Sequence, residues 1–500
     1  MKKIFNFRLL VAIALSVLCG VVICYYSPAL KNFALILLVI IYAVVFSLSG
    51  IFFKEVTWLK RLVVCSVCLF FALCGYGRFY ITVLQTENGA MPSMDYTVSG
   101  TVDSVSEANG KTHIKLIDCK YDGKSGGNLY LYDLSGSVEK GDKIEVECYA
   151  HRAQFIDGNK YFYYVGENIS MVASDAVLLK NSGQSAGIFN FIRGKLKDLI
   201  YTDDDTSSAI ALALFIGDTS KLSYEELSTF RMSGIAHVFA VSGMHVGLLY
   251  FALNFIFKRL KIKRMIAFAV TAVVLLLYVG VCGFSASSLR AGIMCIMAAF
   301  GNTIGEKNDR LNNLAISAII VSLVNVGDVV GVGFILSFTV CLFIIILAPT
   351  IKRALSFLGD KFSSALSVLF AAELASLPIC IVYFGYFPIV AIFTNLLLIP
   401  VITFCYYLIW IGVLLGILLP FQSLGLTAAK LMITGVYTIV DGLAESKAFI
   451  TEFATVYLIA YYPFLVLSGD AVNCKKVTKI SSFAIVLSEI TVSAVVSLIF

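Results

Sequence analysis

The chain has 500 residues, of which 59% are hydrophobic and 14% are charged. Soluble globular proteins contain about 45–50% apolar and about 25% charged residues, so this chain has more apolar surface than a soluble core can bury. The composition excludes an ordinary soluble enzyme, a disordered chain and a coiled coil. It predicts a polytopic α-helical membrane protein.

The net charge of +6 is unevenly distributed along the chain. Residues 91–180 hold 9 Lys and Arg against 13 Asp and Glu, a net charge of −4, which leaves +10 for the rest. The basic residues gather in short loops between apolar runs, as in Lys258–Arg264 with five positive charges in seven residues. The positive-inside rule assigns such loops to the cytoplasm, so we expect a multi-pass cytoplasmic-membrane protein.

Residues 1–90 predict three transmembrane helices. The basic start is followed by an apolar run to Tyr26, and two further runs cover Leu30–Ser49 and Leu62–Leu84. No small-residue cleavage signal follows the first run, so we expect an uncleaved span rather than a signal peptide. Three crossings from a cytoplasmic N-terminus would place the next region outside the membrane.

Residues 91–180 change to the alternating pattern of β-strands, punctuated by turn signals such as Asn109-Gly110 and Asp122-Gly123. Several short strands in this length predict a small, extracytoplasmic, OB-like β-barrel. Barrels that bind nucleic acid are usually basic. The net charge of −4 therefore argues against such a receptor and favours a lid or an assembly surface. Tyr130 and Tyr132 share a strand face and either stack bases or pack on the barrel, with packing favoured.

The same region contains two cysteines, Cys119 and Cys148, in neighbouring strand-like segments. An extracytoplasmic domain often lies in an oxidising compartment, so we expect these cysteines to form a disulfide. Two separate buried thiols are the alternative.

Residues 181–234 predict helices that do not span the membrane. Ile188–Tyr201 is amphipathic, with Arg193, Lys195 and Lys197 among apolar residues, which indicates an interfacial helix. Thr206–Ile216 has only eleven residues and reaches about 16 Å, so it is expected to be re-entrant or interfacial.

Residues 235–500 are almost entirely apolar and predict the main helical membrane domain, for a total of about 10–12 spans. The run Phe387–Leu419 is interrupted by Pro400, which leaves its crossings ambiguous. The apolar runs of this domain are Ile235–Phe257, Met265–Cys282, Leu289–Ile304, Leu311–Val326, Val332–Leu347, Ser363–Tyr383, Phe387–Leu419, Leu424–Ala444, Phe453–Ser468 and Ser481–Phe500.

Ionisable residues inside this domain are the candidate functional groups, since such residues are costly in a bilayer and usually face a bundle interior or a watery cavity. His237 and His245 share one expected span, and Glu373 lies mid-way along another. Counted along ideal helices, His245 and Glu373 are each about 15 Å deep. We therefore expect either a His245–Glu373 pair or separate bonds to serine, water or backbone.

Two further charged residues have a structural and a functional interpretation each. Asp218 follows the short apolar helix and either caps the next helix or lines an entrance. Arg290, near the outer end of a span, either snorkels to the interface or contacts phosphate, whose geometry suits guanidinium. Gly243 permits a close helix approach or a break in the helix.

The segment Ala240-Val-Ser-Gly-Met-His-Val-Gly-Leu-Leu249 resembles the signature of the ComEC-type competence proteins. Further matches lie before and after this segment, in the same order as in that family, and together they cover about Asp203–Trp410. They comprise Gly217-Asp218, Gly234-Ile-Ala-His237, Gly283-Phe284, Leu289-Arg290-Ala291, Val332-Gly-Phe-Ile-Leu-Ser-Phe338, Leu377-Pro378, Phe384-Gly385 and Thr394-Asn395-Leu-Leu-Leu-Ile-Pro400.

The resemblance implies a channel in a bacterial cytoplasmic membrane that imports single-stranded DNA during natural transformation. Its partners would be the DNA strand, the lipid bilayer, other DNA-uptake proteins and a separate nuclease. No cofactor or metal is expected. The expected pathway-lining residues are Asp218, His237, Ser242, Gly243, His245, Arg290, Glu373 and Asn395.

Many members of that family carry a metallo-β-lactamase-like domain with an H-x-H-x-D-H cluster. No H-x-H occurs in these 500 residues, so we expect no zinc nuclease and no enzyme activity here. Two alternatives stay open. One is a transporter of a small or lipid-linked anionic solute, and the other is an intramembrane hydrolase using Ser242 with His245 or His237.

Overall fold

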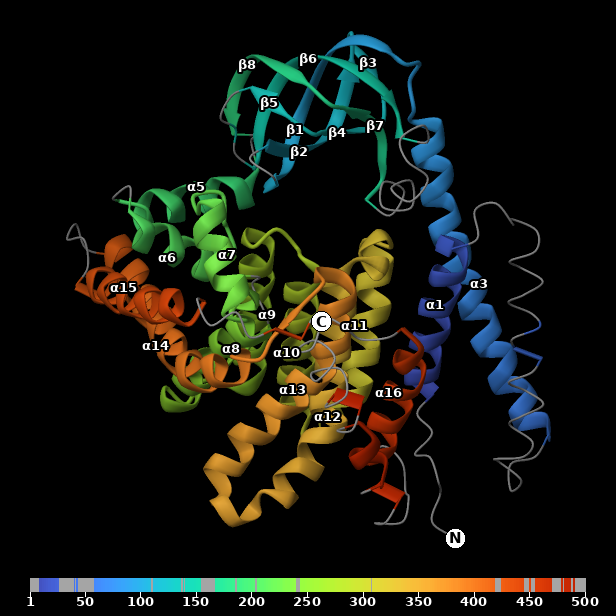
Figure 1. Cartoon of the computed structure of the whole chain (residues 1–500), viewed down its shortest axis with the longest axis vertical. Helices are drawn as coiled ribbons and strands as arrows, with labels where there is room; N and C mark the ends of the chain where they lie inside the picture. Colours follow the sequence, from blue (N-terminus) through green and yellow to red (C-terminus); the bar gives the residue numbers. More distant parts are fainter. Residues whose placement is uncertain are drawn as a thin grey trace. The chain divides into compact units, whose positions relative to one another are not determined.

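The fold is described from a computed structural model of the whole chain (Figure 1). By its internal contacts the chain divides into two compact units. One comprises residues 8–192 and 315–334, and the other comprises residues 1–7, 193–314 and 335–500. The described residues are 9–26, 40, 42–43, 58–108, 111–135, 138, 140–153, 167–184, 187–202, 205–239, 243–306, 308–418, 424–444, 449–450, 455–469, 478–479, 481–486 and 489–490.

The first unit begins with two packed helices, α1 (Leu9–Tyr26) and α3 (Trp58–Asn88). They meet through glycines, because a Cβ on Gly20 would collide with the Ala72 carbonyl oxygen. These helices confirm the first and third expected apolar helices. The second, Leu30–Ser49, lies almost entirely outside the described residues.

The β-domain of this unit is a closed barrel, as the sequence predicted. Five strands form the ring β1-β2-β4-β7-β6-β1, in which only the β4–β7 pair is parallel. β8 and β5 extend the sheet beyond β6, and β3 pairs with β2. The strands are β1 (Met94–Ala108), β2 (Lys111–Tyr121), β3 (Lys124–Ser125), β4 (Asn128–Leu131), β5 (Leu134–Ser135), β6 (Asp142–Arg152), β7 (Ile169–Ala173) and β8 (Ala176–Gln184).

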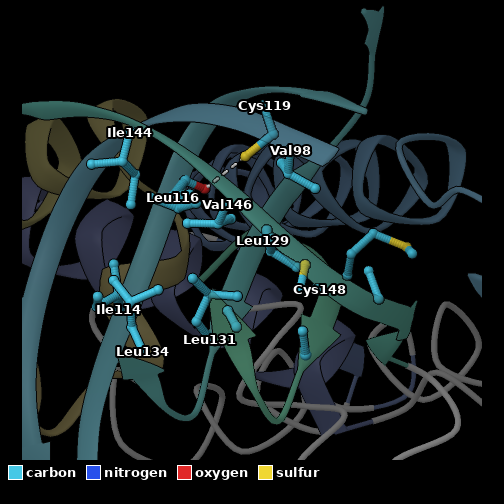
Figure 2. Close-up of a cluster of buried hydrophobic side chains, with 14 of the residues drawn as sticks. Val98, Ile114, Leu116, Cys119, Leu129, Leu131, Leu134, Ile144, Val146 and Cys148 are labelled. Carbon is cyan, nitrogen blue, oxygen red and sulfur yellow. Dashed lines mark hydrogen bonds between the residues drawn. The ribbon is translucent and has the colours of Figure 1, made fainter. Parts of the chain in front are cut away.

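Alternate side chains of these strands fill the barrel interior. In β6 buried and more exposed positions alternate from Asp142 to Ala150. Figure 2 shows the resulting core, in which aliphatic side chains from β1, β2, β4 and β6 converge. Tyr130 and Tyr132 pack together with their ring centroids 5.2 Å apart and lie against a second cluster that contains Val172, which agrees with the favoured packing interpretation.

The expected disulfide between Cys119 and Cys148 is wrong in this structure. Both residues are buried free thiols, and Cys119 Sγ donates to the Leu116 carbonyl (Figure 2). Cys119 lies on β2 and Cys148 on β6, and β1 pairs with both of these strands. Strands two positions apart in a sheet are about 10 Å apart, whereas a disulfide needs Cα atoms within about 7 Å.

A charged cluster joins the barrel to the turn η4 (Gly327–Val330) within the same unit. Lys115 Nζ lies 2.9 Å from Glu167 Oε2 and 3.4 Å from Asp103 Oδ2. The half-buried Asp328 adds a third carboxylate nearby. Burial and then Glu167 raise the pKa of Asp328 to about 6, with Lys115 acting in the opposite direction.

The second unit is built from helices, and those from α9 to α15 coincide with expected apolar runs. The expected run Ile235–Phe257 is not one helix, since α8 begins at Gly243, and most of the run Ser481–Phe500 lies outside the described residues. Three of these helices, α5, α11 and α12, also include residues of the first unit. The helices are α5 (Ile188–Ile200), α6 (Thr206–Ile216), α7 (Tyr224–Met232), α8 (Gly243–Arg259), α9 (Arg264–Val281), α10 (Ala286–Ile304), α11 (Arg310–Val324), α12 (Val332–Ala354), α13 (Asp360–Phe384), α14 (Ala391–Leu418), α15 (Leu424–Ala444) and α16 (Thr455–Ser468).

Six helices in the described part of the chain are long and apolar enough to cross a membrane, and the chain is a multi-pass membrane protein. The expected total of about 10–12 spans stays a prediction, because part of the chain is not described. The six are Leu62–Asn88, Arg264–Val281, Val332–Ala354, Asp360–Phe384, Ala391–Ile417 and Gly425–Ala444.

Two apolar segments, α6 and α14, take forms that the sequence left open. Ten of the eleven residues of α6 are buried, so this helix lies inside the protein and is not interfacial. α14 runs unbroken through Pro400. Proline is tolerated in membrane helices because neighbouring groups satisfy the freed carbonyl.

Candidate functional site

Arg290 is buried in the first turns of α10, where its side chain is only 8% exposed. Its Nε donates to Ser337 Oγ of α12 at 2.8 Å, and its Nη1 lies 3.8 Å from Met294 Sδ. In the described part of the chain, no carboxylate forms an ion pair with this guanidinium. This burial excludes the snorkelling interpretation and leaves a positive charge that lacks a protein counter-ion there.

Gly243 makes room for this arginine at the start of α8. A Cβ at this position would lie 2.9 Å from Arg290 Nη2, closer than real Cβ atoms approach other atoms. The absence of a side chain therefore lets the α8 N-terminus and the guanidinium meet. The neighbouring Ser242, an expected site residue, lies outside the described residues.

The two membrane histidines do not share one helix, contrary to the expected continuous span. His237 lies on the short helix η3 (Ala236–Val238), and its Nδ1 is 3.3 Å from the Gly234 carbonyl. His245 lies in the first turn of α8 and is fully buried. Gly234, whose φ of 78° is left-handed, lies in the turn between α7 and η3.

The backbone of His245 joins a buried aromatic cluster. Tyr406 Oη lies 3.2 Å from the His245 carbonyl oxygen and 3.1 Å from Tyr278 Oη, which donates to the Phe215 carbonyl. The His245 and Tyr406 rings are 4.9 Å apart between centroids. Helices α6, α8, α9 and α14 therefore meet at this point.

Glu373 bonds with Asn395 and not with His245, so the expected histidine–carboxylate pair is wrong. Asn395 Nδ2 donates to Glu373 Oε1 at 2.6 Å. Asn395 and Tyr406 are eleven residues apart on α14, about 16 Å along the helix axis. Along α14, Asn395 therefore contacts Glu373 and Tyr406 contacts His245, at two separate levels. Gly243 and Arg290 contact each other between α8 and α10.

Asp218 forms an ion pair with Arg193, a residue expected at the membrane interface. Arg193 Nη2 lies 3.0 Å from Asp218 Oδ2, and both side chains are almost buried. Asp218 Oδ1 accepts from the Ser220 amide, while Ser223 caps α7 through a capping box with Glu226. Asp218 is therefore not the cap of the following helix. Burial raises its pKa, but Arg193 and Ser220 outweigh burial and hold that pKa below its usual value.

Sequence reasoning missed three partners of the expected residues: Arg193, Ser337 and Tyr406. A signal existed for Arg193, which is seven residues before the buried Ile200 and so lies on the same helix face. Ser337 lies within the family-like segment Val332–Phe338, where its hydroxyl is the only polar side chain. The sequence carried no signal that would single out Tyr406 among the 25 tyrosines.

A family model described as competence protein matches residues 214–472, more than half of the chain. The chain belongs to the competence protein family. All eight expected site residues lie within this match, whereas Arg193 and the β-barrel lie before it.

Curated relatives agree with this competence family membership. ComE operon protein 3 of Bacillus subtilis (strain 168) is 25% identical over 467 residues, which cover 89% of this chain and 57% of the relative. An uncharacterized protein of Mycoplasma genitalium is 25% identical over 238 residues, 46% of this chain and 58% of the relative. The chain thus spans less than three-fifths of these relatives' length. No solved structure matches.

Proposed function

We propose that this competence-family protein carries single-stranded DNA across a bacterial cytoplasmic membrane during natural transformation. The family match supports a role in DNA uptake. The geometric observation that carries the proposal is Arg290, whose buried guanidinium lacks a carboxylate partner in the described residues. A guanidinium matches phosphate geometry with paired donors, so a passing phosphodiester is a suitable counter-ion.

In this proposal the barrel lies outside the membrane and the N-terminus inside. The net charge of −4 and the packed tyrosines support an assembly or lid role for the barrel, with a separate nuclease and other uptake proteins as partners. Cysteine probes test the sidedness. Lys124→Cys on β3 should react with impermeant maleimide in intact cells, and Arg259→Cys only after lysis, each measured against the unsubstituted chain. The reverse pattern would overturn the orientation.

Transformation with labelled DNA tests the role of Arg290. Internalised DNA is measured separately from surface-bound DNA in strains whose only copy carries Arg290→Lys or Arg290→Gln. We expect both variants to lose DNA uptake while DNA still binds to the cell surface. Glutamine removes the charge, and lysine keeps the charge but lacks the paired donors of the guanidinium group. The matched control is Arg353→Lys at the exposed end of α12. Full uptake by a well-expressed Arg290→Gln would contradict the proposal.

The same buried arginine also suits a small or lipid-linked anionic solute. The labelled-DNA experiment separates the two functions, because a solute transporter would leave DNA internalisation unchanged in a deletion strain. The hydrolase alternative gains no support, since its nucleophile Ser242 lies outside the described residues.

A further inference from the structure

Glu373 and Asn395 form a polar pair whose hydrogen bonds are incomplete. Asn395 is only 6% exposed, and its Nδ2 donates to Glu373 Oε1 at 2.6 Å. Its Oδ1 is buried and accepts no hydrogen bond from any described residue. A buried amide oxygen without a donor is unfavourable, so this pair lacks one proton donor.

No positive charge compensates the Glu373 carboxylate in the described structure. Its own helix contributes the thiol of Cys380, and α14 contributes the Asn395 amide. From α16, the hydroxyls of Tyr461 and Tyr462 donate to the carbonyls of Leu374 and Ala375. α12 contributes apolar side chains such as Phe343 and Leu347 to the same core. An ionised carboxylate is costly in such surroundings.

One proton on Glu373 would satisfy both groups. The protonated Oε2 becomes a donor and can bond to Asn395 Oδ1, while Asn395 Nδ2 continues to donate to Oε1. The acid and the amide then form a cyclic pair with two parallel hydrogen bonds. Asparagine suits this position because its side chain offers one donor and one acceptor to the same carboxyl group.

We propose that Glu373 and Asn395 form a proton-binding site inside the helical domain. Water supplies the proton, which binds to Glu373 Oε2 and returns to water on release. The neutral state holds the cyclic acid–amide pair, and the ionised state keeps only the bond from Asn395 Nδ2. The site does not depend on the identity of the transported molecule, so it goes beyond the proposed DNA import.

Infrared difference spectroscopy of the full-length protein in lipid vesicles tests the site over a range of pH. We expect a carbonyl band of a protonated carboxylic acid that shifts in D2O and is lost in Glu373→Gln. Asn395→Leu should keep the band but move it to higher frequency, because the bond to the carbonyl is lost. The matched control is Glu225→Gln in the exposed first turn of α7, which should leave the band unchanged.

Three results would overturn the site: the same band in Glu373→Gln, an unmoved band in Asn395→Leu, or no such band in the wild type at any pH at which it stays folded. If Glu373→Gln does not fold, Glu373→Asp replaces it, and an unmoved band in that variant also overturns the site. DNA uptake is measured separately, so loss of the proton site would leave the proposed import standing.

Discussion

Arg193 and Asp218 form an ion pair with 3.0 Å between Nη2 and Oδ2, and both side chains are nearly buried. Removing one partner would leave the other charge buried and unpaired, which typically costs about 3–5 kcal/mol. We therefore expect Arg193→Leu to lower the free energy of unfolding by about 3 kcal/mol, as measured by denaturant unfolding in detergent. Lys195→Leu, at an exposed position of the same helix, is the control. Equal stability of the two variants would contradict the buried pair.

The contact between Gly243 and Arg290 predicts a separation of function from stability. In Gly243→Ala the new Cβ meets the end of a flexible side chain, so the guanidinium shifts and the helix packing survives. We expect normal membrane levels and reduced internalisation of labelled DNA. Gly247→Ala on the same helix serves as the comparison, since no atom lies within 4 Å of its Cβ. Reduced uptake in both variants would point to a general effect on α8.

Asp328 predicts a pH-dependent stability of the first unit. Its pKa is about 6 in the folded protein against an ordinary value of 3.8, so the folded state binds more protons between these values. The contribution of Asp328 to the free energy of unfolding is therefore largest below pH 3.8 and falls as the pH rises towards 6. Asp328→Asn should remove this slope and stabilise the protein at neutral pH, as followed by thermal unfolding at stepped pH. A slope that persists in Asp328→Asn would assign it to another group.

The two barrel cysteines should be unreactive in the folded protein. Burial raises the pKa of Cys119 to about 12 and that of Cys148 to about 11, so almost no thiolate is present at neutral pH. We expect both to resist alkylation when folded and to react without reductant after unfolding, as counted by mass spectrometry of barrel peptides. A requirement for reductant would show a disulfide instead.

The helices could be predicted from the sequence because their signals are local. The apolar run Thr206–Ile216 coincides with α6, and the turn signals around the barrel strands agree with its hairpins. The failures concern partners that are distant in sequence. Nothing local indicates that β1 separates Cys119 from Cys148, or that α5 turns Arg193 towards Asp218.

The candidate site shows the same limit. Depth along ideal helices placed His245 and Glu373 at one level, but that count assumed one helix from Ile235. The structure has His237 on η3 and begins α8 at Gly243, so the estimate does not hold. Asn395 was expected at the site only through the family resemblance, and its contact with Glu373 depends on the packing of α13 on α14. Side-chain pairing between helices is set by tertiary packing, which hydrophobic periodicity does not encode.

The end of α3 is fastened to the barrel by hydrogen bonds. Thr86 Oγ1 bonds to Asn168 Oδ1 at 2.9 Å, and the Gly127 amide donates to the Gly89 carbonyl at 2.8 Å. A Cβ on Gly89 would lie 2.9 Å from the Gly127 Cα, so the two backbone segments are in direct contact there. A soluble fragment cut at Met91 would therefore expose broken backbone bonds at its edge. A fragment intended for solution binding studies should begin near Gln85, so that the last turn of α3 keeps its hydrogen bonds to the barrel.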